Sequence, residues 1–72
     1  MKIDLHGIRH ADVQREVDKF MGEHLMAGSR SVVIITGNSE KMKAIVGDTL
    51  SDYGMNFVEN TFNSGEVSVD LT

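Results

Sequence analysis

Two residues near the N-terminus carry side chains that could take part in catalysis. Asp4 and His6 stand two positions apart in a run that alternates polar and apolar residues. This alternation predicts a strand over residues 2–6, in which residues two positions apart share a face. A carboxylate and an imidazole on one face could share a metal ion or a water molecule, because histidine exchanges protons near neutral pH and carboxylates bind hard cations. A solvated outer face of a sheet shows the same alternation, so that interpretation stays open as well.

A second cluster of small polar residues follows the strongest strand signal in the sequence. Residues 32–36 are a continuous β-branched run, and Thr36, Gly37, Asn38 and Ser39 lead from it into a helical pattern. Such a turn could cradle a phosphate or a nucleotide backbone, because N–H groups at a helix N-terminus attract anions. Ordinary turn chemistry, with glycine in an unusual dihedral and Asn38 or Ser39 as the cap, explains the same residues. The cluster is neither a Walker loop nor a GxGxxG motif.

Basic residues are few, but several fall beside these two clusters. The 72 residues include 11 acidic and 7 basic ones, which gives a formal net charge of −4. This balance argues against a protein that coats nucleic acid by bulk electrostatics, because phosphate binding depends on Lys and Arg. Arg9, His10, Lys41 and Lys43 nevertheless follow closely on the two strands. They could form a local cationic rim for phosphate, or they could be solvated helix residues diluted by nearby acids.

The order of the predicted elements brings the two clusters together. Hydrophobic spacing and turn residues predict strands over 2–6, 32–36, 56–62 and 66–71 and helices over 11–27 and 40–53. The order β-α-β-α-β-β predicts an α/β fold, a two-layer sandwich with both helices on one face of a four-stranded mixed sheet. We expect the sheet to be mostly parallel, with one antiparallel strand from the final hairpin, whose loop covers 63–65. Strand 32–36 is predicted to be buried on both faces. The ends of the first two strands and the starts of both helices then share one edge, where open α/β sheets bind ligands.

Length and composition limit the number of domains and exclude several classes of protein. A chain of 72 residues, 40% of them hydrophobic, predicts one small globular domain over residues 1–72. The absence of cysteine excludes disulfide scaffolds, zinc–thiolate sites, iron–sulfur clusters and cysteine nucleophiles. No apolar run has the length of a transmembrane helix or a signal peptide, so we expect a cytoplasmic protein without membrane contacts. The aromatic residues form no evident base-stacking platform.

Both clusters also carry a family resemblance. Residues 3–7 (IDLHG) resemble the first motif of the Smr, or small MutS-related, family, and residues 34–39 (IITGNS) resemble its second motif. Residues 66–71 are similar to the closing strand of the family. The likeness covers essentially the whole chain, with the motifs in the right order, and the chain looks like a free-standing version of the domain.

The resemblance implies both a fold and an activity. The implied fold is similar to the C-terminal domain of translation initiation factor three, with the last strand antiparallel beside the second. The implied activity is nucleic-acid binding, with endonuclease nicking of DNA or RNA in several members. By position, Asp4 and His6 match the first motif, and Thr36 and Gly37 match the start of the second.

Two positions depart from the pattern of the family. Ser39 stands where the family commonly has a second glycine, and Asn38 stands where it often has a basic residue. A serine cannot adopt glycine-only dihedrals without strain, so a close approach of the backbone to phosphate could be lost or replaced by a hydroxyl contact. Both departures bear on nuclease activity more than on the fold.

Three functions stay open at this point. In an endonuclease, Asp4 would hold a divalent metal, Mg²⁺ or Mn²⁺, or orient a water, and His6 would assist proton transfer. The residues expected to bind nucleic acid or phosphate are Gly7, Arg9, His10, Thr36, Gly37, Asn38, Ser39, Lys41 and Lys43. A non-catalytic nucleic-acid-binding module would keep this edge and perform no chemistry. A protein-interaction domain, as a homodimer or with a larger partner, would use the outer sheet face or an unpaired edge strand.

Overall fold

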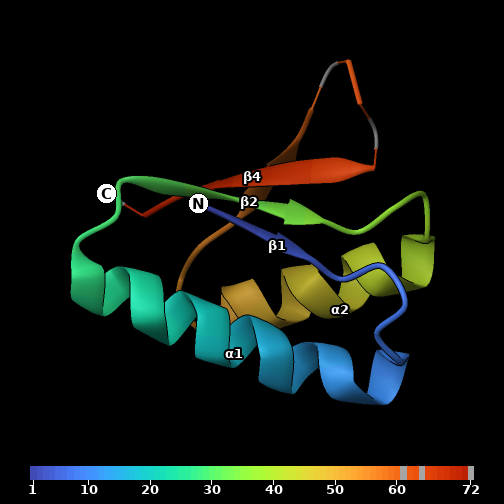
Figure 1. Cartoon of the computed structure of the whole chain (residues 1–72), viewed down its shortest axis with the longest axis horizontal. Coiled ribbons are helices and arrows are strands. Elements are labelled where there is room, and N and C mark those ends of the chain that lie inside the picture. The colour runs from blue at the N-terminus through green and yellow to red at the C-terminus, as the bar shows by residue number, and fades with distance from the viewer. Residues whose placement is uncertain (61, 64, 72) are drawn as a thin grey trace.

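The computed structural model describes residues 1–72 except positions 61, 64 and 72. Its elements are β1 (Lys2–Asp4), α1 (His10–Ala27), β2 (Ser31–Ile35), α2 (Glu40–Ser51), β3 (Phe57–Glu59) and β4 (Glu66–Asp70). The strands form one layer and both helices lie on the same side of it (Figure 1), which confirms the predicted α/β sandwich. Within the described ranges, no helix is long and apolar enough to cross a membrane.

The four strands form a mixed sheet in the order β1-β2-β4-β3. β1 runs parallel to β2, with Ile3 opposite Ile34, and β4 is antiparallel to both β2 and β3. Three strands therefore share one direction, and β4 lies between two of them in the opposite direction. This is the insertion of the last strand beside the second that the family resemblance implied. The crossover from β1 to β2 passes through α1, because parallel neighbours cannot be joined by a tight hairpin.

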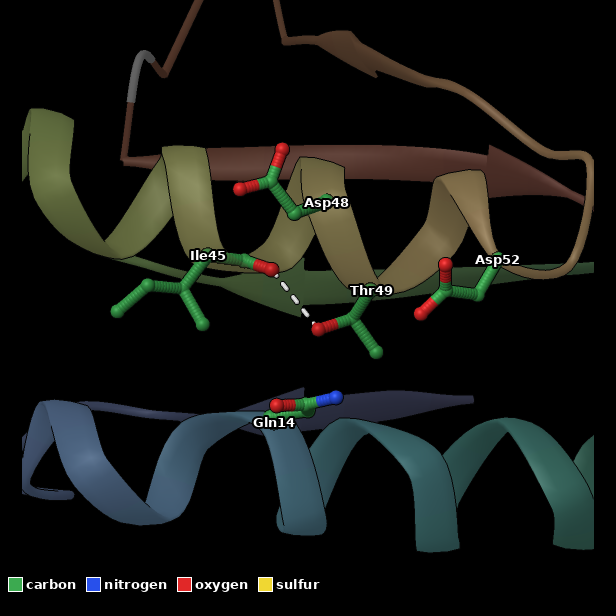
Figure 2. Close-up of a pocket in the computed structure, with 5 residues that line it drawn as sticks. All are labelled: Gln14, Ile45, Asp48, Thr49 and Asp52. Carbon is green, nitrogen blue, oxygen red and sulfur yellow. Dashed lines mark hydrogen bonds between the residues drawn. The ribbon is translucent and has the colours of Figure 1, made fainter.

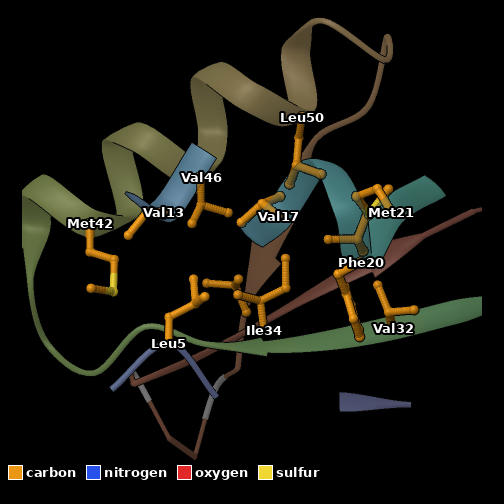
Figure 3. Packing of buried hydrophobic residues seen from close by; sticks show 12 residues of the cluster. Leu5, Val13, Val17, Phe20, Met21, Val32, Ile34, Met42, Val46 and Leu50 are labelled. Carbon is orange, nitrogen blue, oxygen red and sulfur yellow. The ribbon is translucent and has the colours of Figure 1, made fainter. Parts of the chain in front are cut away.

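The hydrophobic core lies between the sheet and the helices (Figure 3). Both helices present apolar residues at helical spacing to the inward side chains of the sheet. The fully buried members are Leu5, Val13, Val17, Met21, Val32, Ile34, Val46, Leu50, Val67 and Val69. Each such side chain contributes roughly 1.5–3 kcal/mol by leaving water, so this layer contact holds the strand ends in place.

The prediction that the 32–36 strand is buried on both faces is wrong. Val32 and Ile34 are buried against the helices, whereas Val33 and Ile35 on the other face are only half-buried. The reason is that both helices cover one face of the sheet, and β2 has an antiparallel neighbour on one side. Antiparallel sheets can leave one face to water, so a β-branched run does not require two covered faces.

Several strands and helices end at other residues than the sequence predicts. β1 ends at Asp4 because residues 6 and 7 form a turn, and α2 ends at Ser51 before a turn over residues 52–54. β3 covers only 57–59 of the predicted 56–62. Position 61 of that predicted strand and position 64 of the predicted loop lie outside the described residues.

Candidate nucleic-acid interface

The C-terminal ends of β1 and β2 lie side by side, and α1 and α2 both begin at that end of the molecule (Figure 1). Leu5 extends the pairing beyond β1, since its N–H donates to the carbonyl oxygen of Ile35 at 2.9 Å. We refer to residues 4–10 and 36–41 as the strand-end edge. The fold thus brings both sequence clusters to the edge that the order of elements predicts.

A tight turn, rather than a shared strand face, joins Asp4 to His6. The Oδ1 atom of Asp4 accepts a hydrogen bond from the backbone N–H of His6 at 2.8 Å. Gly7 follows with φ 83°, and the N–H of Ile8 donates to the carbonyl oxygen of Leu5. An aspartate side chain that bonds the backbone two residues on is a common turn device. One carboxylate oxygen therefore shapes the turn, and the side chains of Asp4 and His6 are both exposed at the edge.

The second cluster is docked onto the β3–β4 hairpin. The N–H groups of Thr36 and Gly37 both donate to the carbonyl oxygen of Gly65, at 2.9 and 3.0 Å. The buried Thr36 hydroxyl donates to the carbonyl oxygen of Gly37 at 2.9 Å and lies 3.4 Å from that of Gly65. Gly37 has φ 64°, a left-handed conformation that favours glycine. These two N–H groups are engaged within the protein and are therefore not free to donate to a phosphate.

Ser39 caps α2 in an unstrained conformation. Its φ of −77° and ψ of 111° are extended backbone that any residue adopts, so no glycine is needed here. Its Oγ accepts a hydrogen bond from the N–H of Met42 at 3.1 Å, and its carbonyl oxygen accepts one from the N–H of Lys43. The N–H groups of Glu40 and Lys41 precede these bonded groups and have no partner within the helix. Together with the positive end of the helix dipole, they suit a phosphate.

Exposed polar side chains lie along the strand-end edge, at the starts of both helices. They are Arg9, His10, Asn38 and Lys41. Arg9 is partly neutralised by Asp12, whose carboxylate lies 3.4 Å from its Nε and also pairs with Arg15 at 3.3 Å. Lys41 makes no ion pair with any residue that the structure describes. Lys41 is therefore the cation of this edge that is best placed to contact an external phosphate.

Lys43 does not belong to the exposed rim, and the prediction that placed it there is wrong. Its side chain is only 7% exposed, and its Nζ lies 3.0 Å from Oε1 of Glu59 on β3. The physical reason is helical spacing, because Lys43 stands on the same face of α2 as the buried Val46 and Leu50. Its ammonium group ties α2 to the edge strand β3 and does not face the strand-end edge.

A hollow lies elsewhere, between α1 and α2 (Figure 2). This interhelical groove has a volume of about 300 Å³ and is lined by Gln14, Ile45, Asp48, Thr49 and Asp52. Gln14 comes from α1, Ile45, Asp48 and Thr49 from α2, and Asp52 from the turn that follows α2. The Thr49 hydroxyl donates to the carbonyl oxygen of Ile45 at 2.8 Å. Its charged side chains are two carboxylates, which repel phosphate. The groove is thus a poor site for nucleic acid despite its shape.

Tyr53, next to Asp52 at the end of this groove, has acidic neighbours that affect its pKa. Its hydroxyl donates to Oδ1 of Asp18 at 3.1 Å. Partial burial of the ring, the hydrogen bond to Asp18, and the charges of Asp18 and Asp52 together raise the pKa of Tyr53 above its ordinary value of 10.0. Acidic side chains from both helices therefore gather on this side of the molecule.

The donor atoms at the strand-end edge do not fit a metal ion held by the protein alone. Within the described part of the chain, no three His, Asp or Glu side chains are grouped as a metal site. Asp4 offers one carboxylate, and its Oδ1 already accepts the N–H of His6. Proteins commonly hold Mg²⁺ through one or two carboxylates together with water and substrate phosphates. A divalent metal at Asp4 would thus need phosphate oxygens from the nucleic acid as further ligands.

Comparison with known proteins settles the family. The family model of the Smr domain matches residues 3–67. The chain belongs to the Smr family. The fold of this Smr domain is similar to that of YdaL, a stand-alone small MutS-related protein from Escherichia coli, with a TM-score of 0.72 and 20% sequence identity. The match covers 96% of this chain and 62% of the YdaL chain, and no curated protein matches the chain.

Three features of this Smr domain were missed by reasoning from its sequence. They are the docking of Gly65 on the second motif, the pairing of the buried Lys43 with Glu59, and the exposure of Phe62, which is 97% accessible. The strand predicted over 56–62 held a signal for the last one, because residues 57 and 62 of such a strand point to opposite faces. The Gly65 contact and the Lys43–Glu59 pair join residues that are far apart in the chain, so no local sequence pattern predicts them.

Proposed function

We propose that this Smr domain binds DNA or RNA at the strand-end edge and nicks a phosphodiester bond there. The observation that carries the proposal is the meeting of both Smr motifs at one edge, beside the capped N-terminus of α2. A cytoplasmic location is part of the proposal. A homodimer or a larger protein partner stays a prediction from the sequence.

The first turn of α2 and Lys41 would hold the phosphate. The N–H groups of Glu40 and Lys41 supply donors without an intrahelical partner, and the Ser39 hydroxyl can donate while its oxygen caps the helix. Because the whole chain carries a formal charge of −4, attraction must come from this local group of donors. We expect weak binding that falls steeply with salt.

Asp4 and His6 would act on the phosphate held beside them. The exposed imidazole of His6 would transfer a proton at the scissile phosphodiester, since histidine takes up and releases protons near neutral pH. The carboxylate of Asp4 would orient the attacking water or the 2′-hydroxyl through the oxygen that does not bond the turn. A divalent cation shared with the phosphate would supply charge stabilisation in the transition state.

Cleavage in the presence and absence of Mg²⁺ or Mn²⁺ tests the proposal. The wild-type protein and Asp4→Asn are incubated with supercoiled plasmid and with a structured RNA. Asparagine keeps an Oδ1 acceptor for the N–H of His6 and removes only the charge, so the turn survives. We expect the wild type to nick at least one polymer and Asp4→Asn to lose most of that activity.

Asp70→Asn is the matched control, because it removes one exposed carboxylate from the far end of the same sheet face. It is expected to cleave like the wild type. Equal cleavage by Asp4→Asn and the wild type would overturn the role of Asp4.

A non-catalytic nucleic-acid-binding module is the second candidate function. The observations that favour it are the engaged N–H groups of Thr36 and Gly37 and the absence of a three-residue metal group within the described residues. This candidate predicts salt-sensitive binding without cleavage under any metal condition. The same experiment therefore separates the two.

A further inference from the structure

Phe62 stands out among the exposed side chains of this molecule. It is 97% accessible and lies in the connection between β3 and β4, which projects away from the helix layer (Figure 1). The backbone N–H of Phe62 donates to Oδ1 of Asn60 at 2.9 Å. A large aromatic ring left in water forgoes the burial that normally stabilises it, so the ring offers a contact surface for a ligand.

The hairpin that carries Phe62 is attached to the strand-end edge. Gly65, three residues further on, accepts the N–H groups of both Thr36 and Gly37 through its carbonyl oxygen. Three residues of chain span at most about 11 Å, so Phe62 lies within that distance of Gly65. The ring is therefore only a few nucleotides away from a phosphate held at the start of α2.

The charge around the hairpin also suits nucleic acid. Residues 60–65 include no charged side chain. The carboxylates that flank them are both paired, Glu59 with Lys43 at 3.0 Å and Glu66 with Lys2 at 3.9 Å. An uncharged segment between neutralised carboxylates lets a polyanion approach, in contrast to the interhelical groove with its two carboxylates.

We propose that Phe62 stacks on an unpaired base of a strand whose phosphate is held at the strand-end edge. The proposal rests on the proposed nucleic-acid binding and names its substrate class, which is single-stranded or locally unpaired DNA or RNA. An exposed aromatic ring can stack on a base that is splayed out of a helix, whereas the bases of a regular duplex are already stacked.

A tryptophan at this position reports the contact directly. The chain has no tryptophan, so Phe62→Trp introduces a single indole whose fluorescence is observed alone. The variant is titrated with a short single-stranded oligonucleotide and with a blunt duplex of the same sequence. We expect the single strand to quench the indole fluorescence, with the same dependence on oligonucleotide concentration as in an independent binding assay. The duplex is expected to leave the fluorescence unchanged.

Phe62→Ala measures how much the ring contributes to affinity. Aromatic stacking on one base corresponds to roughly a fivefold to 100-fold change in affinity. We expect a loss of that size for the single strand and less than about a twofold loss for the duplex. Met26→Ala is the matched control, because Met26 is 93% exposed near the far end of α1, and it is expected to bind like the wild type.

Each outcome separates this inference from the proposed function. Wild-type binding that Phe62→Ala leaves unchanged overturns the stacking role and leaves the proposed function standing. Equal losses for single strand and duplex overturn the unpaired-base specificity. A change of oligomeric state in Phe62→Ala without a change in nucleic-acid affinity identifies the ring as a protein contact. If the wild-type protein binds neither the single strand nor the duplex, both proposals are overturned.

Discussion

The strand-end edge and the interhelical groove are built from the same two helices, yet they differ in charge and in backbone chemistry. The edge uses the helix starts, where N–H groups lack partners within the helix and where Lys41 is exposed. The groove lies along the helix bodies, where backbone groups bond each other, and its charged side chains are acidic: Asp48 within α2 and Asp52 just after it. The groove is the hollow of the two, and the edge has the N–H donors that the proposed function assigns to phosphate.

The difference explains why the proposed site of this small domain is not its interhelical groove. Ligand pockets are commonly concave, but nucleic-acid interfaces depend first on positive charge and N–H donors. In this molecule the order of elements places those donors at the strand ends, away from the hollow. The following substitutions test that contrast, from the largest expected effect to the smallest.

The largest expected effect comes from Glu59→Ala. Removal of this carboxylate leaves the ammonium of Lys43 buried without a partner, and we expect a loss of about 2 kcal/mol in unfolding free energy. Lys43→Met removes the buried charge itself and is expected to cost less. Urea denaturation measures both. Small and equal losses of unfolding free energy in the two variants would show that the ammonium group of Lys43 is in contact with solvent, and the correction made for this residue would then be wrong.

Gly65→Ala tests the docking of the hairpin on the second motif. An added Cβ would lie 3.4 Å from Cα of Gly37 and 3.2 Å from Oδ1 of Asn63, which is tighter than ordinary van der Waals contact, so these neighbours must give slightly. We expect a loss of about 1–2 kcal/mol in stability, as for other overpacked positions, together with weaker nucleic-acid binding.

Gly22→Ala is the matched control for that substitution. Gly22 lies within α1, and a Cβ there would meet nothing within 4 Å. Because alanine favours a helix, we expect a gain of about 0.5–1 kcal/mol and unchanged binding. A Gly65→Ala protein as stable as the wild type would mean that the hairpin does not position the second motif.

Lys41→Gln tests whether the edge attracts the phosphate. Loss of one phosphate contact is expected to weaken nucleic-acid binding by about 1 kcal/mol and to lower the slope of log affinity against log salt by about 1. Lys19→Gln changes the net charge equally but lies along α1 beside Glu16 and Glu23. If both variants lose the same affinity over a salt titration, only the overall charge matters and the edge has no special role.

The smallest expected effect concerns Tyr53 on the acidic side. Tyr53→Phe removes the exposed hydrogen bond to Asp18, and we expect a loss of about 0.5 kcal/mol near neutral pH. Because folding raises the pKa of Tyr53, its contribution is fully present below the ordinary value of 10.0 and is lost as pH rises through the higher folded value. Urea denaturation should therefore show a steeper alkaline decline for the wild type than for Tyr53→Phe. Parallel declines would contradict the acidic character of this side.

The sequence alone determined the elements, their order and the edge at which the two motifs meet. Local periodicity carries this information, since apolar spacing distinguishes helix from strand and right-handed crossovers then limit the topology. The resemblance to the Smr motifs at residues 3–7 and 34–39 is visible for the same reason, because each motif is a short contiguous segment. The sequence also predicted that Asn38 or Ser39 caps the second helix, and the structure assigns the cap to Ser39.

Only the tertiary structure decided which of these groups are engaged and which are exposed. Gly65 lies 29 residues from Thr36 in the chain, and Glu59 meets Lys43 only after β3 has joined the sheet. Burial and pairing of this kind depend on contacts between distant elements, which local spacing does not encode. In the tertiary fold Lys43 is therefore buried and does not lie on the strand-end edge. The N–H groups of Thr36 and Gly37 bond Gly65, and the ring of Phe62 is exposed to solvent.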